Sequence, residues 1–251
     1  DIYIMEVNSG KTRRITNNYY EDKAPSFSPD NTKLVYQSKR EQGWELYVYD
    51  LESGEEKRIT NFSGEAKFPN WSPISGDERI VFEGREGASG AFRINVWMVN
   101  ADGSGLEKIT NTNADNRPVW SGNGTLVIFG RATKDTNGDG RVYSTDNLDI
   151  FTIDPENKNI RRITETDDID EFQFGSSPDG TMIVFCAVSG DANNDGHSNL
   201  QDTRDIHFIN IDGSERKKIE LNDKEIYSPD YSPAVSYTHL RAHETVLDLV
   251  C

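Results

Sequence analysis

The chain has 251 residues, of which 43 are acidic and 27 basic, so its formal net charge is −16. This acidic balance argues against nucleic acid as a partner, because phosphates demand a basic face. Hydrophobic residues make up 34% of the chain, and no apolar run is long enough to cross a membrane as a helix. These properties favour a β protein with a large polar surface.

A short refrain returns five times along the chain: a turn, a charged pair, then Ile-Thr or its equivalent. Successive copies lie 44, 50, 54 and 56 residues apart, a period typical of architectures built blade by blade. We interpret the charged pairs as solvated protection of an outer strand edge. The copies are Arg13-Arg14-Ile15-Thr16, Lys57-Arg58-Ile59-Thr60, Glu107-Lys108-Ile109-Thr110, Arg161-Arg162-Ile163-Thr164 and Lys217-Lys218-Ile219-Glu220.

Three more strand patterns repeat in phase with this refrain. One repeat illustrates them: Pro69-Asn70-Trp71-Ser72-Pro73 leads through a turn into Arg79-Ile80-Val81-Phe82 and then Asn95-Val96-Trp97-Met98-Val99. Four antiparallel strands per repeat predict one propeller blade. The fold class is therefore all-β: a β-propeller with four full blades and partial blades at both ends. Aromatic residues at one blade position are expected to pack between blades: Phe27, Trp71, Trp120, Phe174 and Tyr231.

The same motifs resemble the WD40-like repeat of TolB-type β-propellers. The turn Ser177-Pro178-Asp179-Gly180 and the strand Arg161-Arg162-Ile163-Thr164 carry the resemblance most clearly, whereas Ser121-Gly122-Asn123-Gly124 lacks the turn proline. The resemblance covers residues 1–234 and implies a six-bladed parent. We therefore expect a truncated start and at least one further blade outside this sequence.

Residues 235–251 break the phase of the repeat and resemble a translated sequencing adapter, so we set them apart from the propeller of residues 1–234. Without that tail, Cys186, His197 and His207 are the remaining Cys and His residues. A disulfide framework and a Cys-His metal site are then not expected.

Two loops in consecutive repeats match the spacing of a calcium loop, Asp-x-Asn-x-Asp-Gly with an Asp at position 12. This pattern offers carboxylate and amide oxygens at positions 1, 3 and 5, a backbone carbonyl at 7 and a closing carboxylate at 12. Because both loops occupy the same phase, we predict two structural calcium sites rather than merely polar hairpins. The predicted ligands are Asp135, Asn137, Asp139, Arg141 and Asp146, and Asp191, Asn193, Asp195, His197 and Asp202.

Catalysis finds little support, since the Gly-x-Ser-x-Gly nucleophile elbow is missing. The resemblance implies a non-catalytic, monomeric propeller of the bacterial periplasm or cell surface that binds another protein, such as an envelope lipoprotein or a peptide. Two enzyme alternatives stay open, because one propeller fold serves many functions. The chain could be the gating propeller of a prolyl-oligopeptidase-like serine peptidase, or a propeller polysaccharide lyase.

Overall fold

The computed structural model describes residues 1–6, 8–41, 43–87, 93–166, 169–189, 204–219 and 229, and every regular element in these ranges is a β-strand. The predicted non-native tail, 235–251, lies outside them. Two compact units divide the chain, Asp1–Pro118 and Val119–Cys251, and each is taken by itself below. Within the described ranges no helix is long and apolar enough to span a membrane.

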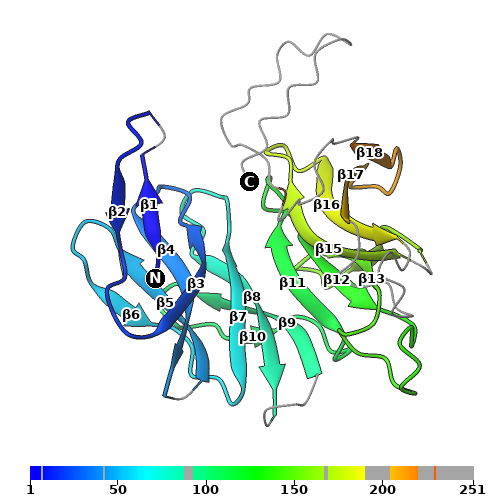
Figure 1. The fold of residues 1–251 in the computed structure, drawn as a ribbon, viewed down its shortest axis with the longest axis horizontal. Helices are drawn as coiled ribbons and strands as arrows, with labels where there is room; N and C mark the ends of the chain where they lie inside the picture. The colour runs from blue at the N-terminus through cyan, green and yellow to red at the C-terminus, as the bar shows by residue number, and fades with distance from the viewer. Residues whose placement is uncertain are drawn as a thin grey trace. The chain divides into compact units, whose positions relative to one another are not determined.

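The first unit contains three antiparallel sheets whose strands follow one another in chain order (Figure 1). The first sheet has two strands and the other two have four each, as expected for blades. Their bounds are β1 (Tyr3–Met5) and β2 (Thr12–Arg14); β3 (Glu21–Phe27), β4 (Lys33–Arg40), β5 (Gly43–Asp50) and β6 (Glu56–Arg58); and β7 (Glu65–Trp71), β8 (Arg79–Glu86), β9 (Arg93–Asn100) and β10 (Glu107–Lys108).

Two more four-stranded sheets follow, and the first of their strands, β11, begins just before the boundary between the units. Four antiparallel sheets, each with four strands in chain order, are propeller blades, so the predicted fold class is confirmed. The strands are β11 (Asp115–Trp120), β12 (Val127–Ala132), β13 (Leu148–Ile153) and β14 (Ile160–Arg162), then β15 (Ile169–Ser176), β16 (Met182–Ser189), β17 (Arg204–Asn210) and β18 (Lys217–Ile219).

Apolar side chains from neighbouring blades meet to form the core. In the first unit Val35 and Val48 pack with Trp71 and Phe82 of the next sheet. The aromatic position of the repeat follows this pattern at Trp71, Trp120 and Phe174, which are all buried. Phe27 differs, because 45% of its surface is exposed, and Tyr231 lies outside the described residues.

In three of the four-stranded sheets the first strand, β3, β7 or β15, contains a β-bulge. Phe68 and Gln173 have φ values of 50° and 57°, and the register of β7 and β15 shifts at these positions. A side chain in this left-handed region is strained unless its surroundings hold it there. At Phe68 the backbone N–H donates to Oε1 of Gln37 on the preceding sheet at 2.6 Å, so a side chain from one blade stabilises the bulge of the next.

The Ile-Thr refrain has a definite structural role. The threonine hydroxyl accepts the backbone N–H of the neighbouring strand at the point where regular pairing ends, as Thr60 does for Leu46 at 2.9 Å and Thr164 for Ile150 at 2.8 Å. The first basic residue of the pair reaches the next blade: Lys57 Nζ donates to the Asp102 carbonyl at 2.9 Å. The basic pairs therefore make specific contacts and do more than solvate an edge.

Candidate functional site

The longest described departure from the bare repeat is the loop 133–147 between β12 and β13, in the second unit. It contains the first predicted calcium-ligand set, and most of that set is exposed to solvent. Gly138 and Gly140 have φ values of 75° and 82°, which favour glycine. The sharp turn predicted at position 6 of the motif is thus present at Gly140.

The carboxylate of Asp135 organises the first half of this loop. Its Oδ1 accepts the N–H of Gly138 and its Oδ2 that of Gly140, both at 2.7 Å. Asn137 Oδ1 in turn accepts the N–H of Asp139 at 3.0 Å. The backbone therefore curls around side-chain oxygens, and each of these oxygens keeps a lone pair that a cation could use.

Asp146, the predicted closing ligand, is 97% buried. Its Oδ1 accepts the N–H groups of Thr136 and Asn137 at 2.9 and 3.2 Å, and its Oδ2 accepts that of Tyr143 at 2.9 Å. Asp146 thus closes the loop by binding its backbone. No three His, Cys, Asp or Glu side chains converge as a metal-binding group anywhere in the described ranges.

Arg141 and Asp139 complete the described set, with the Arg141 N–H donating to Asp139 Oδ1 at 2.9 Å. A calcium ion in this loop would combine the side chains of Asp135, Asn137 and Asp139 with the Arg141 carbonyl, all hard oxygen donors of the kind calcium takes. The second predicted set, Asp191, Asn193, Asp195, His197 and Asp202, lies outside the described residues.

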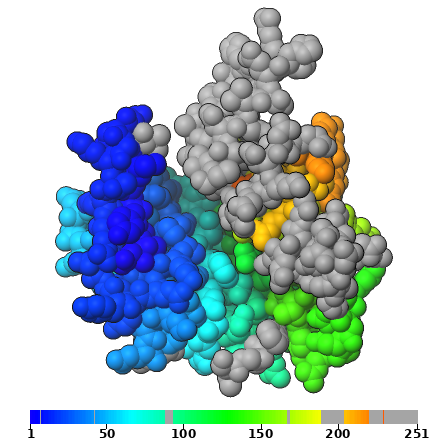
Figure 2. All heavy atoms as spheres, in the orientation of Figure 1, coloured from blue at the N-terminus to red at the C-terminus, as the bar shows by residue number. Residues whose placement is uncertain are grey.

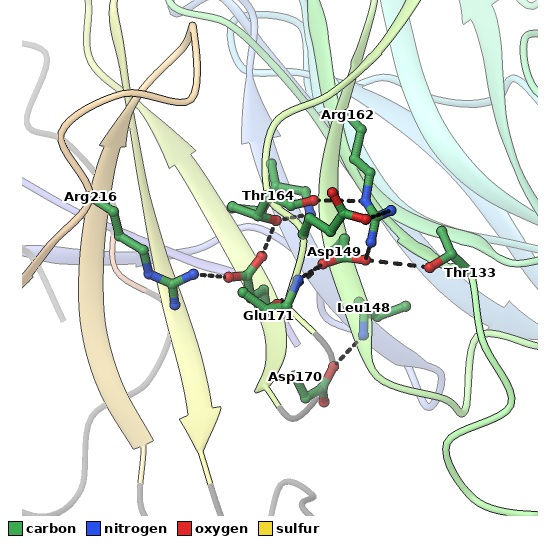
Figure 3. A network of polar contacts seen from close by, with 11 residues as sticks. Thr133, Leu148, Asp149, Arg162, Thr164, Asp170, Glu171 and Arg216 are labelled. Atoms are coloured by element: carbon green, nitrogen blue, oxygen red, sulfur yellow. Dashed lines mark hydrogen bonds and ion pairs between the residues drawn. The ribbon is translucent and has the colours of Figure 1, made fainter.

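A buried polar network begins where the loop ends (Figure 3). Asp149, on β13, accepts two hydrogen bonds. Its Oδ2 accepts one from Nη2 of Arg162 at 2.6 Å, and its Oδ1 accepts one from the N–H of Thr166 at 2.8 Å. The N–H of Leu148 donates to Oδ1 of Asp170 at 3.0 Å. The end of the loop is thus anchored to two strands besides its own.

Glu171 on β15 lies in the same network and has no solvent-exposed surface. Its carboxylate accepts hydrogen bonds from the Thr164 hydroxyl and the Arg216 guanidinium (Figure 3). Burial raises the pKa of Glu171 to about 7, although both partners act in the opposite direction. Glu171 therefore keeps its proton to a much higher pH than an exposed glutamate does.

His207 on β17 also contacts Arg216, whose Nε donates to its Nδ1 at 3.3 Å. Its ring stacks on Phe185 with a centroid separation of 5.7 Å. Burial, followed by the charge of Arg216, lowers the pKa of His207 to about 4. The imidazole is thus neutral at physiological pH and accepts, rather than donates, at Nδ1.

The sequence motifs did not predict this network, although the sequence contains a regular spacing of acidic and basic residues that indicates part of it. Three acids are each paired with an arginine thirteen residues later on the neighbouring strand: Asp1 with Arg14, Glu45 with Arg58 and Asp149 with Arg162. Lys218 pairs with Asp205 at 3.0 Å with the same spacing. The sheet β7–β10 departs from this pattern, because Asn95 stands at the acid position and Lys108 pairs with Glu86 instead. A charge pair that recurs at a constant offset in the other sheets is a structural part of the repeat.

Consecutive four-stranded antiparallel sheets built from one repeat define the chain as a β-propeller. The family model described as "PD40: TolB beta propeller domain" matches residues 1–144, more than half of the chain, so the chain belongs to the TolB β-propeller family. No curated protein matches it.

Several solved structures share this fold. TolB from Acinetobacter baumannii is 17% identical, with a TM-score of 0.65 over 92% of this chain and 51% of that one. An oligogalacturonate lyase from Vibrio parahaemolyticus is 15% identical, with a TM-score of 0.63 over 92% and 66%. An acylaminoacyl peptidase from Pyrococcus horikoshii is 14% identical, with a TM-score of 0.53 over 80% and 32%. The chain spans about half the length of that TolB structure, and likeness at this identity shows the fold alone.

Proposed function

We propose that the chain is the propeller of a non-catalytic scaffold that is exported to the bacterial periplasm or cell surface and binds another protein. Membership of the TolB β-propeller family supports this proposal. The resemblance to TolB-type propellers implies an envelope protein that binds another protein. The partner would be an envelope lipoprotein or a peptide, and the propeller itself a monomer.

The proposal depends on the contrast between an exposed loop and a buried carboxyl group. The described loop that departs from the repeat is exposed, as binding loops usually are. Glu171, the carboxyl group with a pKa near 7, is sealed away from solvent and already bonded to Thr164 and Arg216. A group in this position supports the fold and is not placed to contact a substrate.

Calcium forms the second part of the proposal. It would bind Asp135, Asn137, Asp139 and the Arg141 carbonyl, and it would brace a loop in which Asp146 already holds the backbone. The second loop, with Asp191, Asn193, Asp195, His197 and Asp202, would do the same on the strength of its sequence. The role is structural: the ion neutralises clustered carboxylates and orders the loop.

Calorimetric titration with calcium tests this part. We expect a saturable heat of binding, and Asp135→Ala and Asp191→Ala should each reduce the number of bound ions. The melting temperature should rise with calcium concentration. Asp154→Ala is the matched control, because Asp154 is also a turn aspartate whose Oδ1 accepts two backbone N–H groups. The absence of binding at millimolar calcium would overturn the calcium proposal.

An enzyme is the second candidate, since the same fold occurs in a lyase and in a peptidase. In that case the chain would be the gating propeller of a prolyl-oligopeptidase-like peptidase or part of a polysaccharide lyase. Assays of the purified protein with oligogalacturonate and with acylated peptides distinguish the candidates, because turnover of either substrate contradicts a non-catalytic scaffold. A Gly-x-Ser-x-Gly elbow elsewhere in the parent reading frame would assign the gating role.

A further inference from the structure

The residue that directly follows the third strand of a sheet makes a repeated backbone contact. In three of the four-stranded sheets its N–H donates to the carbonyl of the residue just before the second strand of the same sheet. The three contacts are Leu51 to Thr32 and Ala101 to Glu78, both at 2.9 Å, and Ile211 to Thr181 at 2.8 Å. The three residues are therefore structurally equivalent, although their side chains differ in size.

A large side chain at this position packs towards the preceding sheet. Leu51 and Ile211 each pack against a buried apolar cluster that includes residues of that sheet. The sheet β11–β14 has a proline there, Pro155, which is also buried. The sheet β7–β10 has Ala101, whose side chain is a single methyl group, so the space that leucine or isoleucine occupies elsewhere stays open.

A cavity of about 550 Å³ lies at this point, between the sheets β3–β6 and β7–β10. Both sheets belong to the first unit and pack against one another, and their surface is drawn in blue and cyan in Figure 2. Val48 and Ala101, each only 8% exposed, form an apolar floor. Ligand pockets in proteins occupy about 300 to 1,000 Å³, so this cavity has room for a side chain of another molecule.

Four carboxylates from the two sheets line the same cavity: Asp50, Glu55, Glu78 and Asp102. The backbone N–H of Ser53 lowers the pKa of Asp50, and the hydrogen bond from the Ser104 side chain lowers that of Asp102, so both are ionised at neutral pH. Among the described residues, the carboxylate of Glu55 takes part in neither a hydrogen bond nor an ion pair. The rim of the cavity is thus negatively charged.

Two lysines line the cavity as well, but they do not neutralise it. Lys57 Nζ donates to the backbone carbonyl of Asp102 at 2.9 Å, and Lys33 Nζ lies 3.8 Å from a carboxylate oxygen of Glu78. Arg79, which follows Glu78, forms an ion pair within its own turn and does not line the cavity. Carboxylates therefore outnumber ammonium groups by two, and a cation is the complement of this cavity.

We propose that this cavity is an anchor pocket for a basic side chain, lysine or arginine, of a partner protein. The aliphatic stem of that side chain lies on Val48 and Ala101, and its charged head bonds to Glu55 and Glu78 at the rim. A purely apolar side chain would leave these carboxylates without a partner, and an acidic one would be repelled by them. This inference rests on the proposed function, for which it specifies the chemistry of the partner.

Fluorescence anisotropy with a labelled tetralysine peptide tests the proposal on the whole chain. The buffer contains no calcium and about 150 mM salt, which screens exposed charges beyond about 8 Å. We expect saturable binding. Ala101→Leu places in the pocket the side chain found at Leu51 and changes no charge. It should weaken binding about fivefold or more and raise the melting temperature by about 2–4 °C, because the cavity is filled.

A second variant removes the charge at the rim and keeps the cavity. Glu55→Gln/Glu78→Gln should weaken binding about three- to tenfold, since each exposed charge contact contributes up to a few-fold. Glu41→Gln/Glu52→Gln is the matched control, because it removes two exposed glutamates near the same sheet that do not line the cavity. The control should bind within about twofold of the unaltered protein.

Three results would overturn the anchor pocket. An unaltered affinity in a folded Ala101→Leu variant would show that the peptide binds to surface charge alone. An equal loss in the two glutamine variants would show the same, and this comparison decides if Ala101→Leu does not fold. Tighter binding of free spermidine than of tetralysine would make the ligand a free polyamine instead of a partner protein.

The pocket and the proposed function fail separately. Peptide binding uses neither calcium nor the loop 133–147, so a normal calcium response without peptide binding removes only the pocket. Turnover of oligogalacturonate or of acylated peptides would contradict the non-catalytic scaffold. In that case a loss of peptide binding in Ala101→Leu would still support the pocket as a site for basic side chains.

Discussion

Arg162 and Asp149 lie on neighbouring strands, and Nη2 of the arginine is 2.6 Å from Oδ2 of the aspartate. The same distance separates Arg58 from Glu45 in the first unit, with the same offset of thirteen residues. A charge pair that recurs in this way belongs to the construction of the blade. It also joins the end of the loop 133–147 to the body of its sheet.

Breaking this pair should destabilise the protein much more than breaking an exposed one. Asp149→Ala leaves Arg162 without its buried partner, and we expect a loss of about 3 kcal/mol in the free energy of unfolding, measured with urea at pH 7. Glu165→Ala is the matched control, because Glu165 pairs with the same arginine at 3.2 Å but is 77% exposed, against 4% for the Asp149 side chain. The control should lose less than about 0.5 kcal/mol, and equal losses would contradict the role given to burial.

Glu171 should make stability fall as the pH rises. Its pKa is about 7 in the folded protein and 4.5 in the unfolded chain, so the folded state holds the proton more tightly. The stabilisation is complete below pH 4.5 and is lost as the pH rises to about 7, with a total of up to about 3 kcal/mol. Urea unfolding curves measured across this range should show a free energy of unfolding that falls with pH, and Glu171→Gln should remove this fall. A pH profile in the variant equal to that of the unaltered protein would contradict the prediction.

His207 should act with the opposite sign. Its pKa falls from 6.5 in the unfolded chain to about 4 in the folded protein, so protons bind preferentially to the unfolded state. Stability is then lost as the pH falls from about 6.5 towards 4. His207→Phe, which places at this position the side chain found at Phe151 in the preceding blade, should flatten the acid side of the melting-temperature profile. A steeper acid loss in this variant would exclude the assignment.

Two glycines in the second unit should tolerate alanine very differently. At Gly138 an added Cβ meets no atom within 4 Å, so only the φ of 75° opposes it, at a cost of about 1 kcal/mol. At Gly122 the Cβ would lie 2.2 Å from the Ser177 carbonyl oxygen, and displacing that backbone should cost about 3 kcal/mol. Thermal unfolding of both variants gives the comparison, and the reverse order would show that the hairpin at Ser177 can move.

Periodicity alone was sufficient to predict the blades. Alternating apolar residues, turn residues and a repeat near fifty residues require antiparallel strands in chain order, and the four-stranded sheets β3–β6 and β7–β10 follow that prediction. The sequence also predicted that Asp135 and Gly140 lie in an exposed loop, because the conformation of a turn depends on a few neighbouring residues.

Other properties depend on contacts that no local pattern specifies. Phe27 has the same repeat position as Trp71 but is 45% exposed, because burial depends on what the neighbouring sheet places against the ring. Asp146 was predicted as a calcium ligand from its spacing, yet the fold also directs its oxygens to three backbone N–H groups. That partnership is set by the path of the loop.

The sequence by itself determined the repeat, the strand order and the family, because these follow from local hydrophobic periodicity and turn chemistry. Tertiary structure decided which charges are buried and with whom. Glu171 meets Arg216 across forty-five residues, and Trp44 meets Lys67 from the next sheet. The strength of a charge, a pKa or a cation–π contact depends on distance and desolvation, and these are properties of the folded chain.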